Sequence, residues 1–252
     1  MSLVLVRRPS PRIADGELTH LERVVVDPEL AVAQWQSYVD AYRRRGWDVI
    51  EAPAADEHPD GVFVEDAVVL FDDLAVLTRP GAASRRGEVQ SMRGVVEGLG
   101  VEVASIEAPA TLEGGDVLKV GRTAYVGATS RTNAEGIAQL RALLEPRGWQ
   151  VREVPVTKAL HLKSAVTALP DGTVIGYEPL VDDPSLFDAF LAVPEEHGTA
   201  VVVLDEATVL MSSDAPGTAA LFRARGLEVV TVPVTEFEKL EGCVTCLSVR
   251  VR

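Results

Sequence analysis

Cysteine is scarce in this sequence: its 252 residues include two, Cys243 and Cys246. Two thiols cannot complete a four-ligand zinc site. A chain of this length buries roughly 70 to 75% of its unfolded surface, so it can form a core without a disulfide. The scarcity therefore argues against a disulfide or zinc scaffold. It favours a reducing compartment, with the cytoplasm as the default location.

Long apolar runs are absent as well. The run from Ala200 to Leu204 is far shorter than the roughly 18 residues that a membrane span requires. The apolar start from Leu3 to Val6 is shorter than the core of a signal peptide, which needs about 7 to 15 residues. We therefore expect no transmembrane helix and no membrane partner.

Positive charge is also in short supply. The chain has 24 Lys and Arg against 38 Asp and Glu, which gives a net charge of −14 and a pI near 4.7. Binding to nucleic acid needs a basic face, so a nucleic-acid partner is not expected. An acidic field attracts small cations instead. With 47% apolar and 25% charged residues, the composition is that of a folded globular protein.

One phrase occurs four times: a helical stretch, a Gly, a β-rich run and then Ala-Pro or Val-Pro. It reads RGWDVIEAP, LGVEVASIEAP, RGWQVREVP and RGLEVVTVP. The Gly is the expected C-cap of each helix, at Gly46, Gly100, Gly148 and Gly226. A fifth, degenerate copy is expected from His197 through AVVVLDE. Five units of about 50 residues indicate five β/α modules.

A second strand is expected after each Pro, in FVEDAVVLF, GGDVLKV, HLKSAVTAL and CVTCLSVRV. Five modules are too few for an open solenoid, so we predict a closed ring with strands inside and helices outside. The fold class is therefore α/β, in a single closed domain over residues 1–252. A second domain is the alternative that length alone allows.

Ionisable or nucleophilic side chains occupy the start of each of these strands. They are Glu65 and Asp66, Glu113 and Asp116, His161 and Lys163, and Cys243 and Cys246. Around an axis, these starts meet at one end, which predicts a single site. A single His or Cys is more often structural. The occurrence of such residues at corresponding positions of four units is what favours a site. The remaining histidines, His20, His58 and His197, lie in polar connections and are given no function.

Strand alternation makes two further predictions. Cys243 and Cys246 are three residues apart, so on a strand they lie on opposite faces and only one can face the site. A Cys-x-x-Cys redox pair needs a helix N-terminus to activate its first thiol, and this context argues against one. Lys163 is expected on the same face as His161.

Five segments in this order resemble one known family: FVEDAVV, TLEGGDVLKVG, VGATSRTN, HLKSAVTALPDG and LEGCVTCLSV. They are similar to dimethylarginine dimethylaminohydrolase, a guanidino-modifying family of the pentein superfamily. The resemblance runs from LVRRPSPR to the final strand. It implies a five-fold pseudosymmetric β/α propeller, which agrees with the repeats. It also implies hydrolysis of asymmetric dimethylarginine or monomethylarginine to citrulline and dimethylamine or methylamine, through a covalent Cys intermediate.

The resemblance also implies residue roles. Cys246, in the pattern Gly-x-x-Thr-Cys, matches the nucleophile, His161 the general acid and base, and Glu113 the carboxylate that orients the imidazole. Asp66, helped by Glu65, resembles the pair that receives the guanidinium. The remaining expected substrate-binding residues are Asp60 for the α-amino group, Arg85 and Arg131 for the α-carboxylate, Leu18 in the lid, and Phe63. Cys243 stands where relatives often have an apolar residue.

These residue types suit the implied reaction. A guanidinium carbon is poorly electrophilic, so attack on it needs a strong nucleophile such as a thiolate. Loss of an amine needs a positioned acid, and later activation of water needs a base; one imidazole serves both needs. No metal and no organic cofactor is expected. The expected partner is a small cationic amino acid, and the sequence leaves open whether the chain forms a homodimer.

Other readings compete. An arginine deiminase carries His-x-Asp, where this chain has Lys163, and an amidinotransferase is a further member of the same superfamily. A pentein of another class, a non-catalytic ribosome-binding factor, lacks a Cys-His pair, and the acidic composition argues against it. Outside the superfamily, a Cys-His amidase would not need two carboxylates in its cavity. Assays with dimethylated, monomethylated and plain arginine separate these alternatives.

Overall fold

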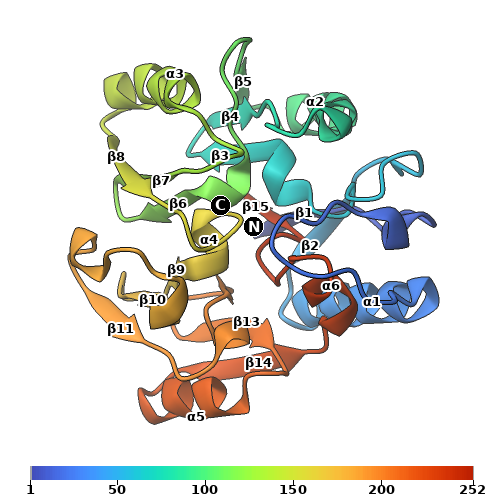
Figure 1. Ribbon diagram of the computed structural model, residues 1–252, viewed down its shortest axis with the longest axis vertical. Coiled ribbons are helices and arrows are strands. Elements are labelled where there is room, and N and C mark those ends of the chain that lie inside the picture. Colours follow the sequence, from blue (N-terminus) through green and yellow to red (C-terminus); the bar gives the residue numbers. More distant parts are fainter. Residues whose placement is uncertain (1, 252) are drawn as a thin grey trace.

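Five small sheets surround a central axis in the computed structural model, which describes residues 2–251 (Figure 1). Each sheet has three strands. In the order of their strands, the sheets are β15 (Val249–Val251), β1 (Leu3–Val6) and β2 (Asp48–Glu51); β3 (Val68–Phe71), β4 (Leu74–Leu77) and β5 (Glu102–Ser105); β6 (Val117–Val120), β7 (Thr123–Ala128) and β8 (Gln150–Pro155); β9 (Val166–Ala168), β10 (Val174–Gly176) and β11 (Phe190–Ala192); and β12 (Val201–Val203), β13 (Thr208–Ser212) and β14 (Glu228–Val232).

Every sheet has the same topology. The inner strand is antiparallel to the middle strand, and the middle strand is parallel to the outer one, as in β3–β4–β5. A parallel pair needs a crossover connection. Helices provide it in four sheets and lie on the periphery in Figure 1: α1 (Pro28–Arg44), α2 (Gly87–Glu97), α3 (Ala134–Leu144) and α5 (Pro216–Ala224). Between β10 and β11 the described connection contains two 3-10 turns instead, Glu178–Leu180 and Pro184–Leu186.

Gly46 and Gly226 directly follow the C-cap residues of α1 and α5, Gly148 ends the 3-10 turn that follows α3, and Gly100 lies two residues beyond Gly98, the C-cap of α2. Gly46, Gly100, Gly148 and Gly226 have φ between +73° and +88°. This left-handed conformation costs glycine little, whereas a Cβ would strain it. The chain therefore turns at each glycine before it enters the outer strand of the sheet.

The fifth copy of the repeat was misplaced. The other four copies coincide with outer strands, and the outer strand of the fourth sheet is β11, followed by Pro194. The run AVVVLDE instead contains β12, the inner strand of the next sheet. Within the described residues, no α-helix lies between β10 and β11, so the helix-Gly signal that marks the other copies is missing there.

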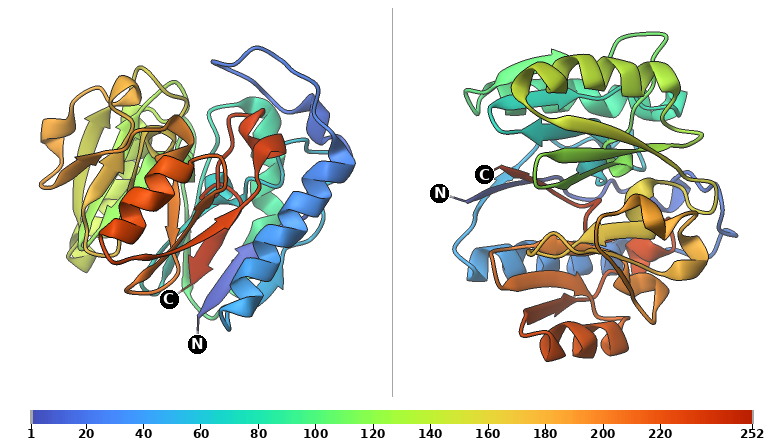
Figure 2. Two further views of the ribbon diagram at one scale, coloured as in Figure 1. Left: turned by 90° about the horizontal axis from the view of Figure 1, so that it is seen from below. Right: turned by 90° about the vertical axis from the view of Figure 1, so that its left-hand side faces the viewer.

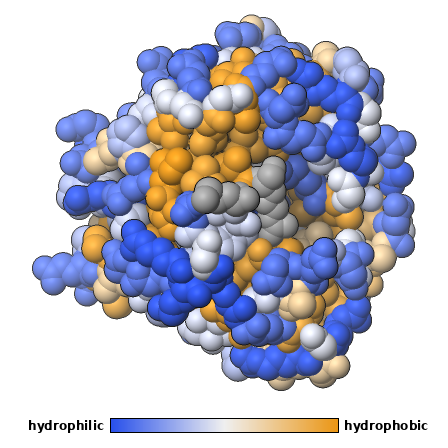
Figure 3. Space-filling model, turned by 180° about the vertical axis from the view of Figure 1, so that it is seen from behind, coloured by the Kyte–Doolittle hydropathy of each residue, from blue (hydrophilic) through white to orange (hydrophobic). Residues whose placement is uncertain are grey.

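The inner strands line the axis, as the ring prediction requires. Residues of β3, β6, β9, β12 and β15 surround a central channel of about 370 Å³. The C-terminal strand β15 pairs with β1, so the end of the chain closes the ring. Figure 2 shows α1 and α5 on the outside of their sheets. Hydrophilic side chains cover much of the rim of the back face, and apolar ones gather nearer its middle (Figure 3).

The chemistry-bearing residues do not begin strands, which corrects the sequence prediction. They lie in tight turns just before the inner strands: 3-10 turns at Val64–Ala67 and Gly114–Asp116, the short helix α4 (Leu162–Ala165), and the turn from Cys243 to Cys246. The same backbone hydrogen bond recurs in each, from Asp66 to Phe63, Asp116 to Glu113, Ser164 to His161, and Cys246 to Cys243. The predicted correspondence between the four segments is therefore confirmed, but each segment is a turn and not the start of a strand.

Helix α1 anchors the last of these turns. The helix begins at an N-cap, Asp27, whose side chain accepts hydrogen bonds from the amides of Glu29 and Leu30. From its buried face, the Tyr38 hydroxyl donates to the carbonyl of Val244 at 2.7 Å. A further short helix, α6 (Thr235–Glu238), precedes this turn. Among residues 2–251, no helix has the length and apolar character needed to cross a membrane.

Candidate active site

A small cavity lies where the turns of several units converge. Its volume is about 20 Å³, close to the space of one water molecule. Its lining includes Asp60, Phe63, Asp66, Arg85, Arg131, His161 and Cys246. These seven belong to the ten residues that the sequence assigned to catalysis or substrate binding. The remaining three, Leu18, Glu65 and Glu113, do not line it.

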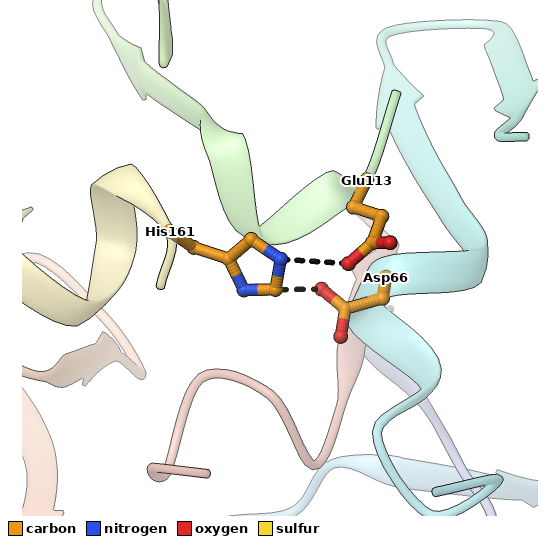
Figure 4. Close-up of side chains that lie close together, drawn as sticks. All are labelled: Asp66, Glu113 and His161. Atoms are coloured by element: carbon orange, nitrogen blue, oxygen red, sulfur yellow. Dashed lines mark hydrogen bonds and ion pairs between the residues drawn. The ribbon is translucent and has the colours of Figure 1, made fainter. Parts of the chain in front are cut away.

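The imidazole of His161 is held by a buried carboxylate. His161 is the N-cap residue of α4, and its Nε2 lies 2.7 Å from Oε2 of Glu113 (Figure 4). The other oxygen of Glu113 accepts a hydrogen bond from the amide of Gly81 at 3.0 Å. Both carboxylate oxygens therefore have partners, and the ring is fixed through one nitrogen. Its Nδ1 stays available on the side of the cavity.

A second buried carboxylate, Asp66, faces the same ring. Its Oδ1 lies 3.9 Å from Nδ1 of His161 and accepts a hydrogen bond from the amide of Gly115 at 3.0 Å. Its Oδ2 pairs with Arg85 at 2.8 Å. Arg85 also binds Glu88 through two nitrogens, at 2.9 and 3.1 Å. Hydrogen bonds therefore fix the Asp66 carboxylate in place. Most of the N–H donors of Arg85 are already bound to Asp66 and Glu88.

These charges set the protonation of the imidazole. Burial alone lowers the pKa of His161, but the carboxylates of Asp66, Asp116 and Glu113 outweigh it and raise the pKa to about 9. At neutral pH the ring is therefore an imidazolium, which can donate a proton. Burial raises the pKa of Glu113, but its hydrogen bond and charge interaction with His161 bring the value below the usual range.

The two thiols lie side by side rather than on opposite faces of a strand, although only Cys246 lines the substrate cavity, as predicted. Sγ of Cys243 is 3.4 Å from Sγ of Cys246. The turn, rather than a strand, brings the two sulfur atoms into contact. The hydrogen bond to Cys243 and burial raise the pKa of Cys246 well above its usual value. Without a ligand, the Cys246 sulfur is therefore a protonated thiol.

Glu65 points away from the cavity, although the sequence placed it beside Asp66. Its carboxylate pairs with Lys163 at 2.6 Å and accepts a hydrogen bond from Thr245 at 2.9 Å. Glu65, Lys163 and Thr245 line the central channel instead. The expectation that Lys163 shares a face with His161 fails for the same reason. The turn of α4 sends the two side chains to different compartments.

Comparisons with known proteins agree with this geometry. The chain matches the family described as "N,N dimethylarginine dimethylhydrolase, eukaryotic" over residues 21–169. It is 58% identical to the N(G),N(G)-dimethylarginine dimethylaminohydrolase of Streptomyces coelicolor, over 98% of this chain and 96% of that protein. The chain belongs to the dimethylarginine dimethylaminohydrolase family. The family resemblance drawn from its motifs is thereby confirmed.

Solved structures of this family share the fold. A crystal structure of a histidine-to-glycine variant, an adduct with S-methyl-L-thiocitrulline, has a TM-score of 0.92 and 32% identity, covering 99% of both chains. A cysteine-to-serine variant from Pseudomonas aeruginosa, complexed with citrulline, has a TM-score of 0.91 and 33% identity, covering 99% of this chain and 98% of that one. The five-fold pseudosymmetric pentein propeller is thereby confirmed.

A lid covers the cavity in this member of the family. We define the lid as residues 16–27, the coil between the 3-10 turn Ile13–Asp15 and α1. The amide of Glu17 donates to Asp60 at 3.1 Å, and Arg131 donates to the Thr19 hydroxyl at 3.1 Å. Leu18 packs on the core cluster that contains Phe63 and Cys246. A cavity of about 20 Å³ cannot hold an arginine, so the lid must open for a substrate to enter.

Glu241, which the sequence did not single out, holds this lid closed. Its carboxylate accepts hydrogen bonds from three consecutive lid amides, those of Thr19, His20 and Leu21, at 2.5 to 3.0 Å. The backbone of Glu241 has a φ of +60°, which is uncommon for a residue other than glycine. The signal in the sequence was weak, because the lid and Glu241 are more than 200 residues apart.

We expect Glu241→Gln to loosen the lid. The amide keeps one acceptor oxygen but turns an NH₂ group toward a lid N–H. Losing hydrogen bonds to a charged group costs about 1.5 to 3 kcal/mol, so trypsin cleavage after Arg23 should become about tenfold faster or more. The position of the cut is checked by mass spectrometry. Glu51→Gln, at an exposed position on β2, is the control. Equal cleavage rates in the two variants would contradict the assignment.

Asp116 is a further residue to which the sequence assigned no individual role. Its Oδ1 accepts from the amide of Leu162, next to His161, at 3.0 Å. Its Oδ2 accepts from Thr132 at 2.6 Å, and Thr132 in turn accepts from the amide of Glu113 at 3.1 Å. Asp116 therefore ties the backbones around His161 and Glu113 together. Burial raises its pKa to about 6.

Asp66, Glu113 and His161 have ligand atoms within 4.8 Å of one another, a spacing that a metal ion could bridge. Their atoms already serve other partners, however. Asp66 pairs with Arg85, and Glu113 accepts from Gly81 and His161. A guanidinium inside the cluster also opposes a second cation. The set is better suited to hold a protonated imidazole, and the absence of a metal stays a prediction.

Proposed function

We propose that this chain hydrolyses asymmetric dimethylarginine and monomethylarginine to L-citrulline and the corresponding amine. The observation that carries the proposal is the convergence of Cys246, His161 and Asp66 on one lid-covered cavity. Family membership supports it, and so do the relatives crystallised with S-methyl-L-thiocitrulline and with citrulline. All individual roles below are part of the proposal.

The amino-acid end of the substrate lies under the lid in this proposal. Arg131 is buried, and its Nη1 makes no hydrogen bond among residues 2–251, although it lies 3.5 Å from a carboxylate oxygen of Glu113. A buried donor that lacks a hydrogen bond favours a ligand carboxylate. Arg85 stands nearby, but Asp66 and Glu88 already bind it. We therefore assign the α-carboxylate mainly to Arg131 and the α-amino group to Asp60. Phe63 forms the apolar wall.

The guanidinium binds beside Asp66 and Cys246. Its positive charge favours the thiolate over the thiol, so substrate binding lowers a pKa that is high in the free protein. The thiolate attacks the guanidinium carbon and forms a C–S bond. His161, an imidazolium, gives its proton to the methylated nitrogen as the C–N bond breaks. Dimethylamine or methylamine leaves.

The second half returns the free thiolate. His161, now neutral, takes a proton from water, and the hydroxide attacks the carbon that carries the sulfur. The C–S bond breaks, and L-citrulline is released. Glu113 keeps the ring in one orientation through both halves, as the third member of a nucleophile, base and orienter set. None of these steps needs a cofactor.

Initial rates on four compounds test the proposal: dimethylarginine, monomethylarginine, arginine and agmatine. Each methylated arginine is expected to exceed arginine in kcat/KM by about tenfold to a hundredfold, because methyl groups gain from leaving water. Agmatine lacks the α-carboxylate, so it should be consumed slowly. Substrate loss is followed by mass spectrometry, with Cys246→Ser as the blank.

Two results would contradict the proposal. Arginine consumed as fast as dimethylarginine would favour a deiminase, the alternative within the superfamily. Efficient agmatine turnover would remove Arg131 from its assigned role. The single domain over residues 1–252, the cytoplasmic location and a homodimer stay predictions.

A further inference from the structure

A second cavity reaches the thiol next to the nucleophile. It has a volume of about 590 Å³, and Cys243 forms part of its lining together with Lys158, His197, Thr199 and Glu238. Cys246 does not line it but lines the substrate cavity. Leu160, Glu241 and Gly242 line both spaces and form the wall between them. The two sulfurs therefore face two compartments.

The turn holds the thiols at a separation that a disulfide can close. The amide of Cys246 donates to the carbonyl of Cys243 at 3.1 Å, the bond that defines a four-residue turn. Such a turn brings its end Cα atoms within about 7 Å, and disulfides usually span 4.4 to 6.8 Å. The sulfurs are already 3.4 Å apart. Small side-chain rotations are enough to join them.

We expect Cys243 to be the more reactive of the two thiols in the free protein. It is half-buried, whereas Cys246 is buried. The hydrogen bond from the Cys246 thiol lowers the pKa of Cys243, and the Thr245 hydroxyl contributes in the same direction. A thiolate is the form that attacks peroxides, so oxidation starts where the thiolate and access coincide.

We propose that Cys243 is a redox modification site, at which a peroxide forms a Cys243–Cys246 disulfide that inactivates the protein reversibly. The Cys243 thiolate attacks one peroxide oxygen, which gives a sulfenic acid and hydroxide. The Cys246 sulfur then attacks the sulfenic sulfur, and its proton leaves with the displaced hydroxide as water. Two thiols and one hydrogen peroxide thus become one disulfide and two waters. A dithiol reductant reverses the reaction by exchange.

The sequence argues against such a redox pair, because it predicts a strand with no helix N-terminus to activate the first thiol. The structure replaces the strand with a turn, and the neighbouring sulfur takes over part of the activation that a helix N-terminus provides elsewhere. The disulfide would stop turnover because it removes the Cys246 thiolate, so the predicted loss of activity rests on the proposed function. Formation of the disulfide does not.

The chain has two cysteines, which makes the experiment simple. The protein is treated with hydrogen peroxide and then denatured, and its free thiols are counted. We expect the count to fall from two to none, with the mass of one chain reduced by two hydrogens. Activity on dimethylarginine should fall in parallel, and dithiothreitol should restore both.

Cys243→Ser is the matched control, because it retains Cys246 and removes its partner. In this variant we expect slower loss of activity and incomplete recovery, since an unpaired sulfenic acid proceeds to irreversible forms. Two free thiols after treatment, a cross-linked pair of chains, or equal recovery in both proteins would overturn the proposal. If the untreated protein is inactive but its thiols still pair, the proposed function fails and this site stands.

Discussion

Replacing Cys246 by serine is expected to lower kcat for dimethylarginine by about a thousandfold or more. The guanidinium carbon carries a delocalised positive charge, and a hydroxyl at neutral pH is too weakly nucleophilic to attack it. The variant should fold normally, because serine is close to cysteine in size. Citrulline formation is the measurement.

Cys243→Ser is the comparison that decides which sulfur acts. Cys243 lines the other cavity, and its hydrogen bond is the largest cause of the raised pKa of Cys246. Replacing Cys243 keeps the proposed nucleophile, Cys246, and removes the main group that raises its pKa. We therefore expect most of the activity to remain. Equal loss in the two variants would contradict the assignment and favour a dithiol mechanism.

The pseudosymmetry could be predicted from the sequence because one physical signal repeats. A helix that ends at a left-handed glycine and passes into a strand leaves the same short pattern each time, and Gly46 and Gly226 show it at opposite ends of the chain. The fourth sheet replaces this helix with 3-10 turns. Its outer strand β11 therefore left no comparable signal, and the unit was misplaced.

The local conformation around the site could not be predicted in the same way. Alternation of side chains applies to a strand, but the stretch from Cys243 to Cys246 is a turn fixed by tertiary contacts. The Tyr38 hydroxyl from α1 and the amide of Glu65 each bind a carbonyl of this stretch. These partners are far away in the sequence. The same limitation affected Lys163, whose side chain pairs with Glu65 in the channel.

The positions of catalytic residue types were easier to identify than the residues that hold them. Asp66 and Cys246 end equivalent turns of different units, His161 begins another such turn, and all three line one cavity. Asp116 also ends such a turn, but its carboxylate binds the amide of Leu162 and the hydroxyl of Thr132. A backbone amide or a threonine hydroxyl cannot be recognised from the sequence as the partner of a carboxylate. The contacts of Asp116 could therefore be identified only in the structure.

Replacing Glu113 by glutamine is expected to lower kcat by about a hundredfold to a thousandfold. The substitution keeps the shape but removes a charge that helps to raise the pKa of His161 to about 9. If the new amide oxygen faces His161, its NH₂ group faces the amide of Gly81, which is also a donor. The imidazole should therefore be less firmly oriented and should lose its proton at lower pH.

The sign of the pH effect follows from the two pKa values. In the free protein His161 loses its proton near pH 9, and the pKa of Cys246 is well above its usual value. The competent pair, thiolate with imidazolium, is thus a minor form. Each unit by which the imidazole pKa falls reduces that form about tenfold. The rising limb of kcat/KM should move to lower pH in Glu113→Gln while its plateau drops. The imidazole titration, followed by NMR, should show the same shift; an unchanged midpoint would mean that Glu113 does not set the protonation of His161.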